Sequence, residues 1–165
     1  MTEAVSVLLM GPAGCGKTRI GHGLAAEIGA SFIDGDDYHP EANIERIRRG
    51  QALTDADRWP WLARLAAMIG TEARAGRSTV LACSALKRCY REALGFPAAR
   101  RWVVELRAPE SVLRARLAER QGHFFNADLL ESQLATLEPV TDGLVVAADA
   151  PDATIIDRIR RCLGL

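Results

Sequence analysis

The sequence is poor in lysine. Its 21 basic residues comprise 19 Arg and only two Lys, Lys17 and Lys87. Arginine therefore supplies basic charge almost everywhere, and the two lysines stand out. A compact ammonium group on a flexible stem is chemically different from the planar guanidinium fork of arginine. Both lysines are candidate functional residues, although chance placement remains the alternative for Lys87.

An excess of one sign of charge is also missing, since 21 acidic residues balance the 21 basic ones. A chain without a basic excess is not expected to bind nucleic acid or a membrane surface in general. No apolar stretch approaches the ~20 residues required to span a bilayer. The N-terminus has no basic leader, so we expect a cytoplasmic protein.

The four cysteines form no CxxC pair, which argues against a zinc site. They are scattered along the chain and fit reduced thiols in a cytoplasmic protein. Their positions are Cys15, Cys83, Cys89 and Cys162.

Short apolar runs alternate with segments of helical spacing along the whole chain. The runs predict strands at 5–10, 31–34, 78–83, 101–106 and 143–146. The intervening segments predict helices at 17–28, 40–49, 54–75, 86–94, 109–120, 127–137 and 151–163. This alternation predicts an α/β fold, a five-stranded parallel sheet with helices on both faces. Without a repeat or a linker, we expect one domain over 1–165.

Residues 11–18 read Gly-Pro-Ala-Gly-Cys-Gly-Lys-Thr and match the P-loop pattern GxxxxGK[ST] completely. The loop follows a predicted strand and opens a predicted helix, as the motif requires. Its backbone N–H groups and the helix dipole favour bound phosphate, and the Lys and Thr side chains would reach the phosphates and Mg²⁺. The residues expected to bind ATP here are Gly11, Gly14, Cys15, Gly16, Lys17 and Thr18.

Cys15 allows two interpretations. Its place at a helix N-terminus would lower the pKa of a thiol and so permits a redox role. The simpler interpretation is a small residue that contributes its backbone N–H group, and we favour it.

An acidic cluster, Asp34-Gly-Asp-Asp37, ends the second predicted strand. Ligands of open parallel sheets bind at these carboxyl ends. We expect Asp34 to help Thr18 bind Mg²⁺, and Asp36 to accept the proton of an attacking hydroxyl. The alternative for the cluster is a turn, which Asp and Gly also favour. His39 is a substrate contact or an ordinary loop histidine.

Four motifs at matching spacing resemble the gluconokinase family of the small P-loop type, and the similarity runs over essentially the whole chain. They are Asp34-Gly-Asp-Asp-Tyr-His-Pro40 with Gly50 to Trp61, Cys83-Ser-Ala-Leu-Lys87-Arg-Cys-Tyr-Arg91, Arg120-Gln-Gly-His-Phe-Phe125, and Gln133 with Leu137-Glu-Pro139.

The resemblance implies a P-loop NTPase with a fold like that of nucleoside-monophosphate and shikimate kinases. It implies a lid at about 117–130 and substrate-binding helices at about 38–75. The activity it implies is transfer of the ATP γ-phosphate to the 6-hydroxyl of D-gluconate, with Mg²⁺ as cofactor. It also suggests a homodimer, for which the sequence contains no interface signature.

Gluconate carries a carboxylate, which bidentate arginine suits. Arg58, Lys87 and Arg91 are the candidate cations, and Lys87 and Arg91 are spaced i, i+4 on a short predicted helix. A solvated basic face is the alternative for that pair, and an ion pair with Asp55 is the alternative for Arg58. Gln133 is a further candidate substrate contact.

Arg116 and Arg120 are also spaced i, i+4, at the end of the helix before the predicted lid. The resemblance implies that Arg116 stacks on adenine and that Arg120 contacts the phosphates. Arg120 is thereby a catalytic candidate beside Lys17 and Asp36, because it would stabilise charge on the transferred phosphate. His123 is either a substrate contact from the lid or an exposed loop residue.

Three functions fit the P-loop. The first is a gluconate kinase, and the second is another small-metabolite kinase of the same fold, such as a shikimate or nucleotide kinase. The segment 34–61 favours the first. The third is a nucleotide-binding switch without turnover, for which the sequence offers no tail, repeat or basic arm.

Overall fold

The computed structural model describes residues 4–120 and 129–165. Its strands are β1 (Ser6–Met10), β2 (Ser31–Asp34), β3 (Thr79–Ala82), β4 (Arg101–Arg107) and β5 (Leu144–Ala147). Its helices are α1 (Lys17–Ile28), α2 (Glu41–Arg48), α3 (Asp55–Arg74), α4 (Arg88–Ala93), α5 (Glu110–Glu119), α6 (Leu130–Thr136) and α7 (Asp152–Leu163), with a 3₁₀ turn, η1 (Gly35–Tyr38). The predicted strands and helices are confirmed to within a few residues at their ends.

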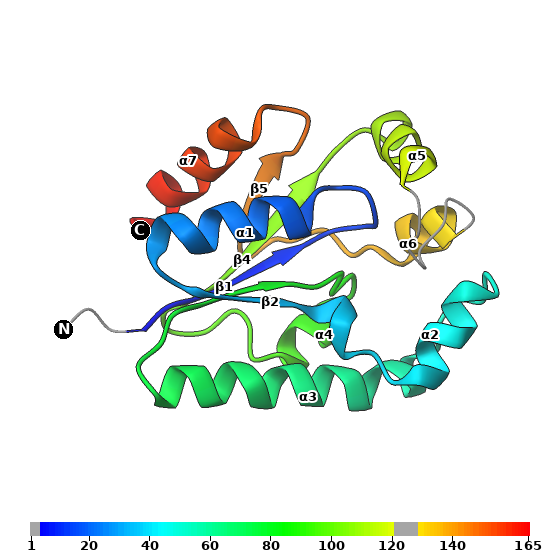
Figure 1. Cartoon of the computed structure of the whole chain (residues 1–165), viewed down its shortest axis with the longest axis horizontal. Coiled ribbons are helices and arrows are strands. Elements are labelled where there is room, and N and C mark those ends of the chain that lie inside the picture. The colour runs from blue at the N-terminus through cyan, green and yellow to red at the C-terminus, as the bar shows by residue number, and fades with distance from the viewer. Residues whose placement is uncertain (1–3, 121–128) are drawn as a thin grey trace.

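All five strands are parallel and lie in the order β2-β3-β1-β4-β5 (Figure 1). The predicted five-stranded parallel sheet is therefore confirmed. Strand β1 is central, and its Ser6 pairs in register with Thr79 of β3 and with Arg101 of β4. Because parallel strands end at the same edge, the loops after β1, β2 and β3 meet there.

Helices cover both faces of the sheet, as Figure 1 shows with α1 and α7 on one face and α3 and α4 on the other. The side chains of β1 alternate between the two layers. Val7 and Leu9 belong to the core under α1 and α7, whereas Leu8 and Met10 belong to the core over α3. This alternation follows from the two-residue period of a strand, and it explains why the central strand is apolar from Val7 to Met10.

A local sequence signal sets the start of α3, the helix that carries Arg58 and Trp61. Thr54 and Asp57 form a capping box at the start of α3, where Thr54 Oγ1 accepts a hydrogen bond from the Asp57 N–H at 3.2 Å. Asn43 Nδ2 of α2 donates to the Asp57 carbonyl at 2.9 Å, which ties α2 to the same turn. The acidic segment after β2, for which a turn was the alternative interpretation, forms η1, with Asp34 Oδ1 accepting from the Asp36 N–H.

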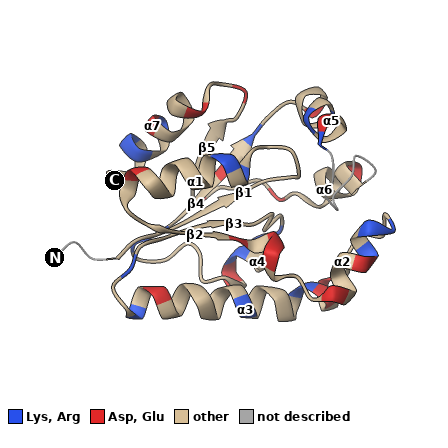
Figure 2. Ribbon diagram, in the orientation of Figure 1, with Lys and Arg blue, Asp and Glu red and all other residues tan. Residues whose placement is uncertain are grey.

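Basic and acidic residues are spread over the helices of both layers (Figure 2). Within residues 4–120 and 129–165, no helix has both the length and the apolar character that crossing a membrane requires.

Candidate active site

The loop between β1 and α1 has a conformation that glycine alone adopts easily. Gly11, Gly14 and Gly16 have φ values of 144°, 86° and 97°. A Cβ atom at Gly11 would lie 2.8 Å from the Leu106 carbonyl oxygen, and one at Gly14 would lie 3.1 Å from the Leu113 carbonyl oxygen. These positions therefore need glycine for two reasons, backbone conformation and close approach to neighbouring chain.

Lys17 folds back over this loop. Its Nζ donates to the carbonyl oxygens of Gly11 at 2.9 Å and Pro12 at 3.0 Å. These two bonds hold the ammonium group beside the loop. Cys15 is buried within the loop and packs in the core under α1. Its side chain is thus a small packed residue, but its backbone N–H, expected to serve the phosphates, donates to the Pro12 carbonyl at 3.3 Å.

A pocket opens over the loop, and we call it the phosphate pocket. It is lined by Ala13, Gly14, Gly16, Lys17, Thr18, Asp36, Ser84, Arg120 and Gln133. Six of these were expected at the site from the sequence as ATP-binding or catalytic residues. The loop, the ends of β2 and β3, and the end of α5 all contribute to it.

Thr18 and Asp34 lie together although they come from opposite sides of β3. Thr18 Oγ1 donates to Asp34 Oδ2 at 2.7 Å. Hydroxyl and carboxylate oxygens are the donors that Mg²⁺ prefers, and Mg²⁺ usually takes few protein ligands beside phosphates and water. The pair fits such an ion. In the part of the chain that the structure describes, no three His, Cys, Asp or Glu residues group as a metal site of their own.

The carboxyl group of Asp36 in the phosphate pocket has a raised pKa. Burial raises the pKa of its carboxyl group to about 6, the nearby Lys17 lowers it, and the neighbouring Asp34 and Asp37 raise it. The side chain keeps 23% of its surface exposed, so a substrate can reach it. A carboxylate with this pKa is mostly ionised at neutral pH and can accept a proton from a hydroxyl.

His39 is buried next to Asp36, with 3.9 Å between its Nε2 and Asp36 Oδ1. Its ring stacks on Trp61, with ring centroids 4.0 Å apart. Trp61 is itself fixed, since its Nε1 donates to the Gly35 carbonyl at 2.8 Å. Burial lowers the pKa of His39 to about 4, assisted by the charge of Arg58. The imidazole is therefore neutral at pH 7, a hydrogen-bonding group rather than a cation.

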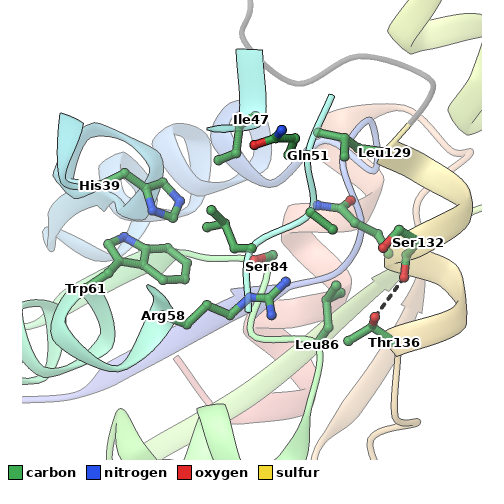
Figure 3. A pocket seen from close by; sticks show the side chains of 13 residues that line it. His39, Ile47, Gln51, Arg58, Trp61, Ser84, Leu86, Leu129, Ser132 and Thr136 are labelled. Carbon is green, nitrogen blue, oxygen red and sulfur yellow. Dashed lines mark hydrogen bonds between the residues drawn. The ribbon is translucent and has the colours of Figure 1, made fainter. Parts of the chain in front are cut away.

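A second pocket adjoins the first, and we call it the Arg58 pocket (Figure 3). It holds about 450 Å³, its open mouth included. Its polar lining is His39, Gln51, Arg58, Ser84, Ser132, Gln133 and Thr136, and its apolar lining is Ile47, Ala52, Leu53, Trp61, Leu86 and Leu129. Figure 3 shows His39, Trp61 and Arg58 on one side and Ser132 and Thr136 of α6 on the other.

Arg58 is the cation of this pocket. One of its terminal nitrogens, Nη1, donates to the Tyr90 hydroxyl at 3.0 Å and lies 3.7 Å from an oxygen of Asp55. The ion pair with Asp55, given above as the alternative, is therefore present, and Arg58 also lines the pocket. A contact between Arg58 and a bound carboxylate stays a prediction.

Lys87 and Arg91, expected on one helix face, reach different partners. Lys87 lies before α4 and pairs through Nζ with Asp55 at 3.1 Å. Arg91 is buried, and its Nη1 donates to the carbonyl oxygens of Ala85, Leu86 and Glu138. Neither residue lines the phosphate pocket or the Arg58 pocket. Lys87 supports the Arg58 side of the site through Asp55, and Arg91 holds the turn after β3.

Arg116 of α5 and Arg120, which directly follows that helix, lie beside the P-loop. Arg116 Nη2 donates to the Ala148 carbonyl at 2.8 Å and Nη1 to the Gly14 carbonyl at 3.3 Å, so it bridges the loop and the end of β5. Arg120 lines the phosphate pocket. His123 and most of the expected lid lie outside the described residues.

The chain is similar to known proteins over nearly its full length. A family model described as AAA domain matches residues 7–140. The gluconokinase of Gluconobacter oxydans (strain 621H) is 44% identical over 158 residues, which cover 93% of this chain and 89% of the relative. The crystal structure of a gluconokinase from Sinorhizobium meliloti 1021 is 38% identical, covers 99% of this chain and 94% of its own, and superposes with a TM-score of 0.83.

The chain belongs to the gluconokinase family.

The unliganded structure of a sugar kinase from Janibacter sp. HTCC2649 agrees with this placement. It is 42% identical, covers 98% of this chain and 95% of its own, and has a TM-score of 0.91. A shikimate kinase from Bacteroides thetaiotaomicron shares the fold alone, with 20% identity over 98% of this chain and 99% of its own, and a TM-score of 0.68. The expected likeness to shikimate kinases is thus confirmed at the level of fold.

The two pockets meet at residues that the sequence analysis missed in part. Ser84 and Gln133 line both pockets. Ser84 was not singled out, although it follows β3 at the carboxyl edge of the sheet, and that position was the available signal. Gln51 was not singled out either, although it lies in the motif from Gly50 to Trp61. Ser132 and Thr136 were missed because isolated polar residues on a helix carry no recognisable pattern. Most of the lining of the Arg58 pocket thus comes from the segments 34–40, 50–61 and 83–91 that carried the family resemblance, while Ile47, Leu129, Ser132 and Thr136 lie outside them.

Proposed function

We propose that the protein transfers the γ-phosphate of ATP to the 6-hydroxyl of D-gluconate, giving 6-phospho-D-gluconate and ADP. The observation that carries this proposal is the junction of the two pockets at Ser84 and Gln133. A phosphate donor in one pocket and a polar acceptor in the other would meet there, beside Asp36. Membership of the gluconokinase family supports gluconate as the acceptor.

The Arg58 pocket has the chemistry that an open-chain sugar acid requires. Its guanidinium group is oriented by the Tyr90 hydroxyl and can bind a carboxylate in bidentate fashion. The hydroxyl and amide side chains of the lining can pair with the hydroxyls of the substrate, and neutral His39 adds another hydrogen-bonding group. With the carboxylate bound at Arg58, the far end of the sugar would point to the phosphate pocket.

Asp36 is the proton acceptor in this mechanism. It takes the proton of the 6-hydroxyl while the hydroxyl oxygen forms a bond to the γ-phosphorus. The bond between that phosphorus and the bridging oxygen breaks, and its electron pair leaves with ADP. Lys17 and Arg120 place positive charge beside the transferred group and so stabilise the transition state. Mg²⁺, held by Thr18 and Asp34, would neutralise phosphate charge.

An acceptor panel tests the proposal. Formation of ADP from ATP and Mg²⁺ is followed with gluconate, shikimate and nucleoside monophosphates, each at about 1 mM, the upper end of usual KM values. We expect rapid ADP formation with gluconate and little with the others. Faster turnover of shikimate or a nucleotide would assign the alternative kinase function, and tight ATP binding with no active acceptor would assign a nucleotide-binding switch.

A homodimer, which the family resemblance suggests, is a separate prediction. Sedimentation of the purified protein tests it, and a monomer at micromolar concentration would contradict it.

A further inference from the structure

One hydrogen bond joins the P-loop to the opposite wall of the site. Gln133 Oε1, on α6, accepts from the backbone N–H of Ala13 at 2.7 Å, although the two residues are 120 positions apart in the chain. Ala13 lines the phosphate pocket. Inward N–H groups of a P-loop bind phosphate oxygens, so the carboxamide oxygen lies where a phosphate oxygen would be expected.

The first half of the loop offers few other N–H groups to a ligand. The Gly11 N–H donates to the Ser84 carbonyl at 3.2 Å, and the Cys15 N–H donates to the Pro12 carbonyl at 3.3 Å. Pro12 has no N–H group. Neither Gly11 nor Pro12 therefore offers a free backbone N–H to a phosphate. The N–H of Ala13 is the first in the loop that faces the pocket. Gln133 holds this donor.

Helix α6 itself is anchored, so the side chain rather than the helix has to move. Leu130 is fully buried in the core under α1, and Leu134 packs against the same core. Gln133 lies between them in sequence and lines both the phosphate pocket and the Arg58 pocket. Rotation of the Gln133 side chain would move its carboxamide from the phosphate pocket to the Arg58 pocket without moving the backbone.

We propose that Gln133 Oε1 accepts from the Ala13 N–H before nucleotide binds. A phosphate oxygen of the nucleotide then replaces it as the acceptor, and the freed carboxamide turns into the Arg58 pocket, where it hydrogen-bonds the acceptor substrate. One N–H group cannot serve both acceptors fully, so nucleotide and Gln133 compete. Binding of nucleotide thereby prepares the acceptor pocket, and Gln133 is a positioning residue that couples the two. The coupling rests on the proposed function, whereas the competition at Ala13 does not.

Calorimetric titration of a non-hydrolysable ATP analogue with Mg²⁺ tests the competition. Q133A removes the competing oxygen, and we expect the analogue to bind about threefold to tenfold more tightly, the range that one net hydrogen bond represents. Q133E places a charged competitor at the same N–H and should weaken binding. Q51A is the matched control, since it removes a carboxamide that lines only the Arg58 pocket, and it should leave the affinity for the analogue unchanged.

Weaker or equal binding by Q133A, with a melting temperature like that of the wild type, would overturn the proposal, because the carboxamide would then assist the nucleotide or be irrelevant to it. The coupling is tested by titrating gluconate with and without the analogue. The wild type should bind gluconate more tightly with the analogue present, and Q133A should lose most of that difference. Equal coupling in both proteins would contradict the second half of the proposal. If gluconate binds to none of the proteins, the proposed function fails, while the analogue titration still decides the competition.

Discussion

Asp36 and His39 lie 3.9 Å apart across the base of the site, and the fold shifts their pKa values in opposite directions. Burial disfavours the charged form of each, which raises the pKa of the acid to about 6 and lowers that of the histidine to about 4. At neutral pH the pair is a carboxylate beside a neutral imidazole. The site thus keeps a proton acceptor without pairing it to a cationic histidine.

These shifts predict how the stability of the ligand-free protein depends on pH. Between pH 4 and 6 the folded protein binds a proton at Asp36 that the unfolded chain has largely lost, so this group makes stability fall as pH rises. His39 does the reverse, because the unfolded chain holds its proton up to about pH 6.5. Each effect is worth about 3 kcal/mol at most, at 1.36 kcal/mol per pKa unit, and the two largely cancel.

Replacing Asp36 with Asn should remove the opposing titration, so that the effect of His39 on the pH dependence of stability becomes measurable. Urea unfolding of D36N should show stability that rises with pH from 4 to 6.5, by an amount well above that of the wild type. D142N is the control, because Asp142 is an exposed carboxylate that is not among the charges shifting the pKa of Asp36 or His39, and its profile should follow the wild type. Identical profiles for D36N and the wild type would refute the assigned pKa shift of Asp36.

The same variant separates stability from activity. D36N removes the proton acceptor, and we expect kcat to fall by at least ~10²-fold, the usual scale for loss of a general base. At pH 7 the variant should be no less stable than the wild type, since a buried charge has been removed. Steady-state kinetics at pH 7 give the comparison, and an unchanged kcat would remove Asp36 from the mechanism.

Lys17 should be essential to turnover and dispensable for folding. Its Nζ donates to the carbonyls of Gly11 and Pro12 and to Cys15 Sγ, all within the loop, so K17A should keep its circular dichroism spectrum and lose nearly all activity. K17R is the informative partner, because a planar guanidinium is a poor substitute for a compact ammonium among phosphates. Wild-type kcat in K17R would contradict the role given to this side chain.

Arg58 and Arg91 should differ in what they control. R58A removes the proposed carboxylate contact, and we expect KM for gluconate to rise by about 10- to 100-fold, the value of one charge-assisted hydrogen bond. R74A, an exposed arginine of the same helix, is the control and should leave KM unchanged. An R58A enzyme with wild-type KM would place the carboxylate elsewhere.

R91A should instead lose stability. It leaves the carbonyl oxygens of Ala85 and Glu138 without the Arg91 donor, while the Leu86 carbonyl keeps the Glu138 N–H. This loss costs about 2 to 4 kcal/mol in the free energy of unfolding. R88A is the control, because Arg88 precedes Arg91 by about one helical turn in α4 and is exposed. It should lower the free energy of unfolding by no more than about 0.5 kcal/mol. Denaturant midpoints of the two variants test this, and similar midpoints would show that the buried bonds of Arg91 contribute little.

The sequence predicted the fold and the phosphate pocket well because both depend on local patterns. The apolar run of β1, the glycines at 11, 14 and 16, and the helix from Lys17 are set by residues within about 25 positions of one another. Asp36 was found because it follows a strand, and parallel strands end at one edge. These features need no knowledge of distant contacts.

The contacts around the Arg58 pocket were harder to predict because they depend on side-chain direction and on residues far apart in the chain. Lys87 and Arg91 have helical spacing, but Lys87 precedes the helix and turns to Asp55, while Arg91 turns into the interior. The bond between Gln133 and Ala13 joins two elements that no periodicity relates. Such contacts are decided by how α6 packs against the loop.

Identification of the product tests the central claim most directly. The protein is incubated with ATP, Mg²⁺ and D-gluconate, ADP is quantified, and the phosphorylated sugar acid is assigned by phosphorus–proton correlation NMR. We predict one phosphogluconate for each ADP, with the phosphate on the oxygen of carbon 6. ADP accompanied by inorganic phosphate alone, a phosphate on another hydroxyl, or no ADP that depends on gluconate would contradict it.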